Sequence, residues 1–278
     1  MLAPSHLPEN FGTWNRKWGA PFGRKTPIVN RVIHKLPMSL QARLRGPFGY
    51  EANNATRTFE YPWAYHSVPI RAGDNIVEIG GGLSGFQFVL SKAGCKVTNV
   101  DPGGEGSGSL LPLEEKNIAS LNRWFGTNVK FVKQRIETLE LDAESQDRVY
   151  TISVIEHLTF EEIERVVDCV FRILKKGGFL VMTVDLFLNL LPFTSRVKNE
   201  WGTNVDLRWL SRLQPLEVAQ GLPSELFGFP EFDPQYILSN LEKYMIGLSD
   251  LENMMYSYPC LTQCLVLRKP EQTAAMLG

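Results

Sequence analysis

The chain has 278 residues, of which 44% are hydrophobic and 21% charged, so it can bury a core, and extensive disorder is excluded. A formal net charge of -1, a pI near 6.5 and the lack of a recognised binding module argue against nucleic acid as a partner. The most apolar run, residues 179–193, contains Asp185 and is too short to span a bilayer, so we expect a cytoplasmic protein without a transmembrane segment.

The first 50 residues are basic, because they hold eight lysines and arginines against the single acid Glu9. One interpretation is an electropositive flap that attracts an anionic acceptor, a carrier domain or a membrane surface. The alternative is a solvated basic face. Residues 1–66 also hold ten of the chain's thirty aromatic residues, which predicts an N-terminal cap over 1–66, followed by the main domain at 67–278.

Strand and helix signals alternate from residue 76 onward, which predicts a parallel sheet covered by helices. The helix after Thr159 is the clearest, because Thr159 and Glu162 form a capping box and apolar residues then recur at helical spacing until Gly177. The patterns predict strands at 76–79, 96–100, 129–132, 148–153, 179–184, 216–219 and 260–267, and helices at 85–92, 114–125 and 206–213. An insertion at about 221–258 is expected to hold one more helix, near 234–244.

Residues 76–85 read Ile-Val-Glu-Ile-Gly-Gly-Gly-Leu-Ser-Gly, a buried strand that runs into a glycine turn and a helix. The glycines at 80, 82 and 85 match the dinucleotide fingerprint G-x-G-x-x-G, which is a weak signal alone. Glu78 decides between cofactors. A carboxylate before the turn would repel the pyrophosphate of a nicotinamide or flavin cofactor, whereas it would attract the ammonium group of S-adenosylmethionine.

Three later segments, residues 99–102, 147–158 and 174–183, follow this motif in a fixed order. Together with residues 78–85 they resemble the motifs of class I S-adenosylmethionine-dependent methyltransferases. The resemblance implies an α/β, Rossmann-like, seven-stranded and mostly parallel sheet with helices on both faces. An N-terminal helical cap and a C-terminal insertion would complete the acceptor pocket.

The resemblance also assigns the cofactor contacts. The backbone of Gly80, Gly81 and Gly82 would approach the cofactor closely, since glycine has no Cβ. Asp101, followed by Pro102, would accept the ribose hydroxyls; the alternative for Asp101 is a cap for the following loop.

Five further residues complete the expected cofactor set. The family's third-strand loop usually supplies an aspartate to the adenine amine, and Arg135 stands there, so we expect Gln134 or Ile136 to make that contact instead. Ser153 is placed beside the cofactor, and Tyr65 near its methionine end. The alternative for Tyr65 is that it packs its helix against the sheet.

Methyl transfer from a sulfonium is an in-line displacement with a neutral leaving group, so positioning supplies much of the rate. A hydroxyl acceptor also benefits from a general base, for which His157 and Asp185 are the candidates because they follow the fourth and fifth strands. A structural role is the alternative for His157. The other histidines and the cysteines at 95, 169, 260 and 264 show no metal-ligand spacing, so we expect free thiols and no metal.

These observations predict an S-adenosylmethionine-dependent methyltransferase that acts on a hydroxyl or amine of a small molecule and releases S-adenosylhomocysteine. A sugar, sugar nucleotide or secondary metabolite fits the expected cap and insertion. Two alternatives stay open: a noncatalytic S-adenosylmethionine-binding partner protein and a nicotinamide-dependent oxidoreductase.

Overall fold

A computed structural model describes residues 1–24, 35–103, 111–244 and 259–271. The chain divides into two compact units, one formed by Leu7–Thr138 and the other by Met1–His6 with Leu139–Gly278. The seven strands follow the order β3-β2-β1-β4-β5-β7-β6 in one sheet, in which the β1, β2 and β3 pairings and the β4–β5 pairing are parallel. The predicted mostly parallel α/β fold is confirmed.

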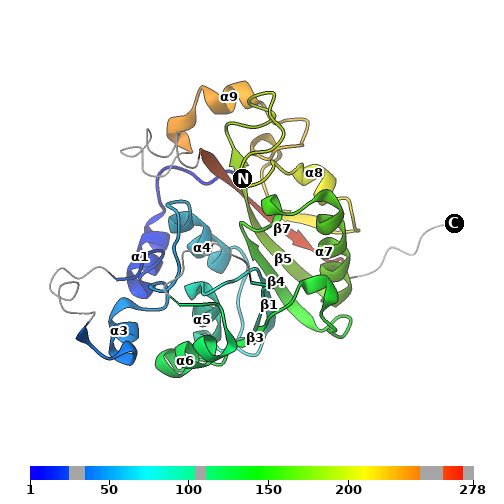
Figure 1. Ribbon diagram of the computed structural model, residues 1–278. Helices are drawn as coiled ribbons and strands as arrows, with labels where there is room; N and C mark the ends of the chain where they lie inside the picture. Colours follow the sequence, from blue (N-terminus) through cyan, green and yellow to red (C-terminus); the bar gives the residue numbers. More distant parts are fainter. Residues whose placement is uncertain (25–34, 104–110, 245–258, 272–278) are drawn as a thin grey trace. The chain divides into compact units, whose positions relative to one another are not determined.

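The Leu7–Thr138 unit holds the first three strands and the helices around them (Figure 1). The glycine at each helix end explains where α1 and α6 stop, since Gly19 and Gly126 both adopt the left-handed backbone conformation that favours glycine. The elements are α1 (Glu9–Trp18), α3 (Met38–Arg45), α4 (Arg57–His66), β1 (Asn75–Ile79), α5 (Gly85–Lys92), β2 (Lys96–Val100), α6 (Glu115–Phe125), β3 (Lys130–Val132) and η2 (Ile136–Thr138).

Aromatic side chains hold the segment before β1 in this unit. Phe48 packs between Trp14 and Tyr61, with ring centroids 5.7 and 4.9 Å apart, and Tyr61 stacks on Phe86 of α5 at 5.8 Å. Such pairs stabilise a core beyond the apolar area that they bury. Residues 7–66 therefore share a compact unit with the first three strands, and the division at residue 66 stays a prediction.

The second unit holds the remaining strands. Strand β5 pairs in parallel with β4 and antiparallel with β7, and β6 pairs antiparallel with β7. At the start of the chain, Leu2 forms a bridge with Gln263 of β7. The elements are β4 (Gln146–Ile152), η3 (Ile155–His157), α7 (Phe160–Ile173), β5 (Leu174–Phe187), α8 (Leu207–Leu210), β6 (Glu217–Gln220), η4 (Pro223–Glu225), α9 (Pro234–Leu238), η5 (Leu241–Lys243) and β7 (Cys260–Arg268).

The junction of α7 and β5 corrects the sequence-based expectation. The capping box of Thr159 and Glu162 is present, but the helix ends at Ile173 and not at Gly177. Leu174 is already extended and fully buried, and β4 pairs first with Leu174 and then with Phe179 across a register irregularity. Gly177, with a φ of 76°, lies within this irregular start of the strand.

The C-terminal insertion also differs from its prediction. The expected helix at 234–244 is split into α9 and η5, and residues 245–258 lie outside the described part of the chain. The expected helix at 206–213 is shortened to α8. All four cysteines are buried free thiols. Among the described residues, no helix has the length and apolar character needed to cross a membrane.

Candidate active site

The turn between β1 and α5 depends on glycine. Gly80 and Gly82 have φ values of 66° and 49°, a region that L-residues with a side chain rarely adopt. The Gly80 amide donates to the Val100 carbonyl at 2.9 Å, and the Ser84 hydroxyl caps α5 by accepting from the Phe86 amide at 3.0 Å. The turn therefore joins the end of β1 to the helix in one defined backbone conformation.

Two buried amide side chains that the sequence analysis missed hold this turn. Asn99 Nδ2 donates to the Gly82 carbonyl at 2.9 Å and to Gln87 Oε1 at 3.0 Å. Gln87 Nε2 donates to the carbonyls of Gly82 and Ser84 at 3.1 and 3.0 Å. The sequence signal was the placement of polar residues within an apolar strand and an apolar helix, where a buried amide requires hydrogen-bond partners.

Asp101 links two loops at the end of β2. Its Oδ2 accepts from the Gly82 amide at 2.9 Å, and its Oδ1 accepts from the Gly103 amide at 2.7 Å. The loop-capping alternative for Asp101 is therefore realised. Each carboxylate oxygen can accept a second hydrogen bond, so the ribose role remains compatible with this geometry and stays a prediction.

Glu78 is a buried carboxyl group beside the glycine turn. Its residue is 1% exposed, and its Oε2 has no hydrogen-bond partner among the residues that the structure describes. Burial, followed by the nearby Glu51 carboxylate, raises the pKa of Glu78 well above its ordinary value. An orphaned, buried carboxyl oxygen is a position that a cationic ligand would stabilise.

Glu51 is a further site residue that sequence reasoning missed. It lies in the segment between α3 and α4, and a Cβ built on Gly82 would overlap its Oε1. Burial raises the pKa of Glu51 to about 7, although the charge of Arg57 and a hydrogen bond from the Leu83 backbone oppose this rise. No short motif signals this residue, because its partners are about 30 positions away in the sequence.

Glu51, Glu78 and Asp101 together form what we call the acidic cradle. Asp101 contributes to raising the pKa of both glutamates, and Arg57, which opposes the rise at Glu51, is itself paired with Glu60. The cradle therefore fits a ligand that carries positive charge and hydroxyl groups. A pyrophosphate at the same turn would meet electrostatic repulsion.

The loop after β3 lies at the same edge as Asp101, since the Asp101 amide donates to the Val132 carbonyl at 3.1 Å. Ile136 is buried and Gln134 partly buried, whereas Arg135 is exposed and forms an ion pair with Glu137 at 3.4 Å. Pro102 is exposed. Gln134 and Ile136, which are predicted to contact adenine, thus follow a strand end that is hydrogen bonded to Asp101, the predicted ribose contact.

Tyr65 has the contacts of a packing residue. The centroids of its ring and the Trp14 ring are 5.6 Å apart. Burial raises the pKa of its phenol, and the nearby Cys95 thiol raises it further. Cys95 directly precedes β2, whereas the glycine turn follows the carboxyl end of β1. This placement favours the packing alternative over the expected cofactor contact. Tyr61, one turn earlier on α4, interacts with Ser84 and Glu78 instead.

In the second unit, Ser153 and Asp185 come together. Ser153 has a φ of 48°, is buried, and places its Oγ 3.4 Å from Asp185 Oδ1. Asp185 does not follow the fifth strand as expected, because β5 continues to Phe187. It is fully buried, and its amide donates to Glu156 Oε1 at 3.2 Å. A fully buried carboxylate can reach an acceptor only after local rearrangement.

His157 lies in η3 and is exposed, with its Nδ1 hydrogen bonded to the Trp201 carbonyl. The neighbouring Glu156 carbonyl accepts from the Thr203 amide at 3.0 Å, and Gly202 packs so closely on this carbonyl that a Cβ there would overlap it. These contacts give the Glu156-His157 pair a structural role. The contact of Nδ1 with a carbonyl requires that Nδ1 carries a proton, because a carbonyl only accepts hydrogen bonds.

Comparisons with known proteins agree with this geometry. Residues 77–182 match the family model described as a methyltransferase domain. A maize protein named phosphoethanolamine N-methyltransferase 1 is 26% identical over 130 residues, which cover 46% of this chain and 24% of that protein. The chain therefore spans about a quarter of the length of this curated relative.

Three solved structures share the fold. The [4+2]-cyclase SpnF has a TM-score of 0.54 and 16% identity, with 91% of this chain and 100% of that chain covered. A putative sarcosine dimethylglycine methyltransferase from Galdieria sulphuraria has a TM-score of 0.53 and 13% identity, with 96% and 100% covered. Phosphoethanolamine N-methyltransferase 2 from Haemonchus contortus, in complex with phosphomonomethylethanolamine and S-adenosylhomocysteine, has a TM-score of 0.52 and 15% identity, with 84% and 56% covered.

Proposed function

We propose that this chain, whose residues 77–182 belong to the class I S-adenosylmethionine-dependent methyltransferase family, transfers a methyl group to a hydroxyl or amine of a small molecule. The cofactor is S-adenosylmethionine and its product S-adenosylhomocysteine. The acidic cradle is the observation that carries the proposal.

The charge of the cradle favours this cofactor over a nicotinamide dinucleotide. S-adenosylmethionine brings an ammonium and a sulfonium, and a cation near Glu51 and Glu78 would offset the cost of burying their charged forms, which is the main cause of their raised pKa values. A nicotinamide dinucleotide would place a pyrophosphate against the same carboxyl groups. The oxidoreductase alternative is therefore disfavoured on electrostatic grounds.

The residues of this chain would divide the binding of the cofactor among them. Glu78, assisted by Glu51, would hold the ammonium, and Asp101 would accept the ribose hydroxyls with the hydrogen-bond capacity left beyond its two backbone donors. Gln134 and Ile136 would contact the adenine. The bound cofactor supplies an electrophilic methyl group, so the protein's main task is to orient the acceptor in line with it.

Proton removal from the acceptor depends on its chemistry. A hydroxyl requires a base, and we assign His157 to this role because its ring is exposed and it lies in η3, directly beyond the carboxyl end of β4. An amine acceptor can release its proton to water. Asp185 would contribute by holding Ser153 and Glu156 in place, as their contacts with it suggest.

For the acceptor, a sugar, sugar nucleotide or secondary metabolite remains our proposal. The names of two relatives refer to small amines. These names support keeping an amine, as well as a hydroxyl, as a candidate for the group that is methylated. A second candidate function is cofactor binding without methyl transfer, because a structure with the same fold is titled a [4+2]-cyclase.

The test combines binding with turnover. Purified protein and S-adenosylmethionine with a labelled methyl group would be incubated with a cell extract, and labelled products identified by mass spectrometry. We expect a labelled small molecule and stoichiometric S-adenosylhomocysteine. Cofactor binding without labelled product from any extract would favour the second candidate, and tight binding of a nicotinamide dinucleotide instead would contradict the proposal.

A further inference from the structure

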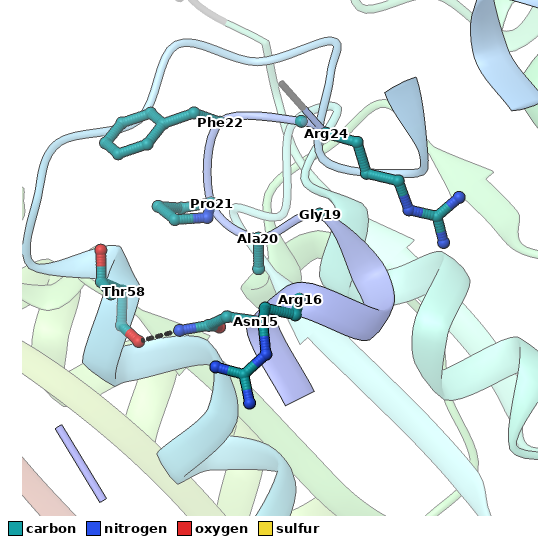
Figure 2. A pocket seen from close by; sticks show the side chains of 9 residues that line it. Asn15, Arg16, Gly19, Ala20, Pro21, Phe22, Arg24 and Thr58 are labelled. Carbon is teal, nitrogen blue, oxygen red and sulfur yellow. Dashed lines mark hydrogen bonds between the residues drawn. The ribbon is translucent and has the colours of Figure 1, made fainter. Parts of the chain in front are cut away.

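A pocket of about 510 Å³ lies in the Leu7–Thr138 unit, apart from the residues of the acidic cradle. It is formed by the end of α1, the Gly19–Arg24 loop and the start of α4 (Figure 2). This volume is in the range of small-molecule sites. The proposed function assigns no role to the pocket.

The floor of the pocket is fixed by Asn15, a side chain that is 7% exposed. Its side-chain Nδ2 donates to the Thr58 carbonyl at 2.8 Å. The backbone carbonyl of Asn15 accepts from the amides of Gly19 and Ala20 at 2.7 and 3.1 Å. Asn15 Oδ1 has no hydrogen-bond partner in the described ranges. The Asn15 side chain is therefore a fixed support that holds the end of α1 to the start of α4 beneath the pocket.

One wall of the pocket is apolar. Figure 2 shows Pro21 and Phe22 on one side of the pocket and Asn15 and Thr58 on the other. The Phe22 residue is 48% exposed, so part of its surface is open to solvent. A flat apolar group in the pocket would cover this ring and remove its surface from water.

Two arginines make the pocket positively charged. Arg16 Nη2 donates to Thr13 Oγ1 at 3.0 Å, and Arg24 Nη2 donates to the Lys17 carbonyl at 2.6 Å. Both acceptors are neutral, and neither arginine forms a salt bridge within the part of the chain that the structure describes. Guanidinium groups bind phosphate and carboxylate oxygens well, because their donors match the geometry of these anions.

We infer that this pocket, which we call the basic pocket, binds a small molecule that carries a phosphate or carboxylate next to a flat apolar body. The anion lies against Arg16, the charge of Arg24 on the same pocket adds to the attraction, and the apolar body lies against Pro21 and Phe22. Such a ligand is excluded from the acidic cradle by charge, so the inference concerns a second site and goes beyond the proposed function.

The basic pocket is also joined to the cradle's surroundings by hydrogen bonds. The Pro21 carbonyl accepts from Asn53 Nδ2 at 2.8 Å, and Asn53 Oδ1 accepts from the Tyr61 hydroxyl at 2.9 Å. Asn53 is two residues from Glu51. The loop that lines the pocket at Pro21 is therefore hydrogen bonded to the segment that supplies Glu51 to the cradle.

The test uses phenyl phosphate and benzoate as probes on the full chain, with phenol and inorganic phosphate as the halves of the first probe. Binding is measured by isothermal titration calorimetry. We expect phenyl phosphate to bind about tenfold more tightly than either half, because the site contacts both the anion and the ring. A stronger response to benzoate would identify a carboxylate ligand rather than a phosphate ligand; phenol binding as tightly as both anionic probes would overturn the inference.

Variants then locate the bound probe. Arg16→Gln and Phe22→Ala should each weaken the binding of the tighter probe by about fivefold to tenfold, because each removes a direct contact. Lys17→Gln is the matched control, since Lys17 is an equally exposed cation on the same helix that does not line the pocket. It should change binding by less than about twofold. Equal effects of Lys17→Gln and Arg16→Gln, or no binding by wild-type protein, would overturn the inference.

Titration with S-adenosylhomocysteine separates this inference from the proposed function. All three variants should bind it as the wild type does, which also shows that they are folded. If the wild type binds the anionic probe but not S-adenosylhomocysteine, the proposed function fails while the basic pocket stands; the opposite result removes only the pocket.

Discussion

The acidic cradle and the basic pocket lie in the same compact unit and carry opposite charge. Glu78 in the cradle is 1% exposed, whereas Arg16 and Arg24 of the pocket are exposed. Burial makes an uncompensated charge costly, so the pKa values of Glu51 and Glu78 are raised. The two exposed arginines are screened by solvent and salt. Changes in the cradle should therefore have larger effects than changes in the pocket.

The largest expected effect is that of Gly82→Val. The new side chain would have to adopt a φ of 49° and would overlap Glu51 Oε1, so both the turn and the cradle are disturbed. We expect binding of S-adenosylhomocysteine to weaken at least about 100-fold, together with a loss of stability of roughly 1–3 kcal/mol from the strained backbone.

Gly73→Val is the matched control, because Gly73 also has a positive φ, of 92°, but a Cβ there meets nothing within 4 Å. Thermal unfolding and calorimetry on both variants separate backbone strain from crowding. Gly73→Val should lower stability and leave cofactor affinity unchanged. Equal cofactor affinities in the two variants would show that the space beside Gly82 is irrelevant to binding.

The next effect is that of Asp101→Asn. One of the two backbone amides, of Gly82 or of Gly103, would lose its acceptor, and the charge offered to the ribose would disappear. Cofactor affinity should fall by about 1.5–3 kcal/mol, or roughly 10-fold to 100-fold, as measured by calorimetry. A lower melting temperature with unchanged affinity would leave Asp101 with the loop-capping role alone.

The sequence predicts the local elements of the site but not the contacts between residues that are distant in the sequence. The bounds of α5 and β2, and the capping box of α7, agree with the sequence because they depend on neighbouring residues: a glycine turn, an apolar run and an N-cap. Glu51 and Asn99 were missed because their roles depend on contacts with the glycine turn, which is distant in the sequence.

Other contacts of this kind also lie beyond local patterns. Helix α4 turns Tyr61 toward Ser84 and packs Tyr65 against Trp14, and the cofactor contact of Tyr65 stays a prediction. The cap over residues 1–66 stays a prediction, and no local pattern reveals that Leu2 pairs with Gln263. Long-range pairing of this kind is set by packing and not by local propensity.

A smaller effect is expected from pH, through the Glu51 carboxyl, whose pKa is raised to about 7. A raised carboxyl pKa means that the folded protein holds this proton more tightly than the unfolded chain does. The stabilising contribution is therefore complete below the ordinary carboxyl pKa and is lost as pH rises through 7. Thermal unfolding of the cofactor-free protein should show this decrease in stability, and Glu51→Gln should reduce it, with the remainder due to Glu78, whose pKa is also raised.

Cofactor binding should respond to pH in the opposite direction, because a cation favours the ionised form of Glu51. Affinity for S-adenosylmethionine should rise by about threefold to tenfold between pH 6 and pH 7.5. The rise should be smaller in Glu51→Gln, in which only Glu78 still couples cofactor binding to proton release. An affinity that falls over this range would contradict the assignment of a cation to the cradle.

The smallest effect distinguishes the two regions by salt. Raising ionic strength from 0.05 to 0.5 M should weaken phenyl phosphate binding by roughly threefold, since Arg16 and Arg24 are exposed and screened. Binding of S-adenosylhomocysteine should change by less than about twofold, because buried charges are screened much less. Equal salt dependence at the two sites would contradict the difference in burial on which the comparison rests.

The central claim is that Glu78 recognises a cationic cofactor, and calorimetric titration of S-adenosylmethionine into wild-type and Glu78→Gln protein tests it most directly. The substitution preserves shape and removes a buried ionisable group, so the cofactor-free variant should be at least as stable as the wild type. The account predicts that its affinity is lower by about tenfold or more. A folded Glu78→Gln protein that binds the cofactor as tightly as the wild type would contradict the account.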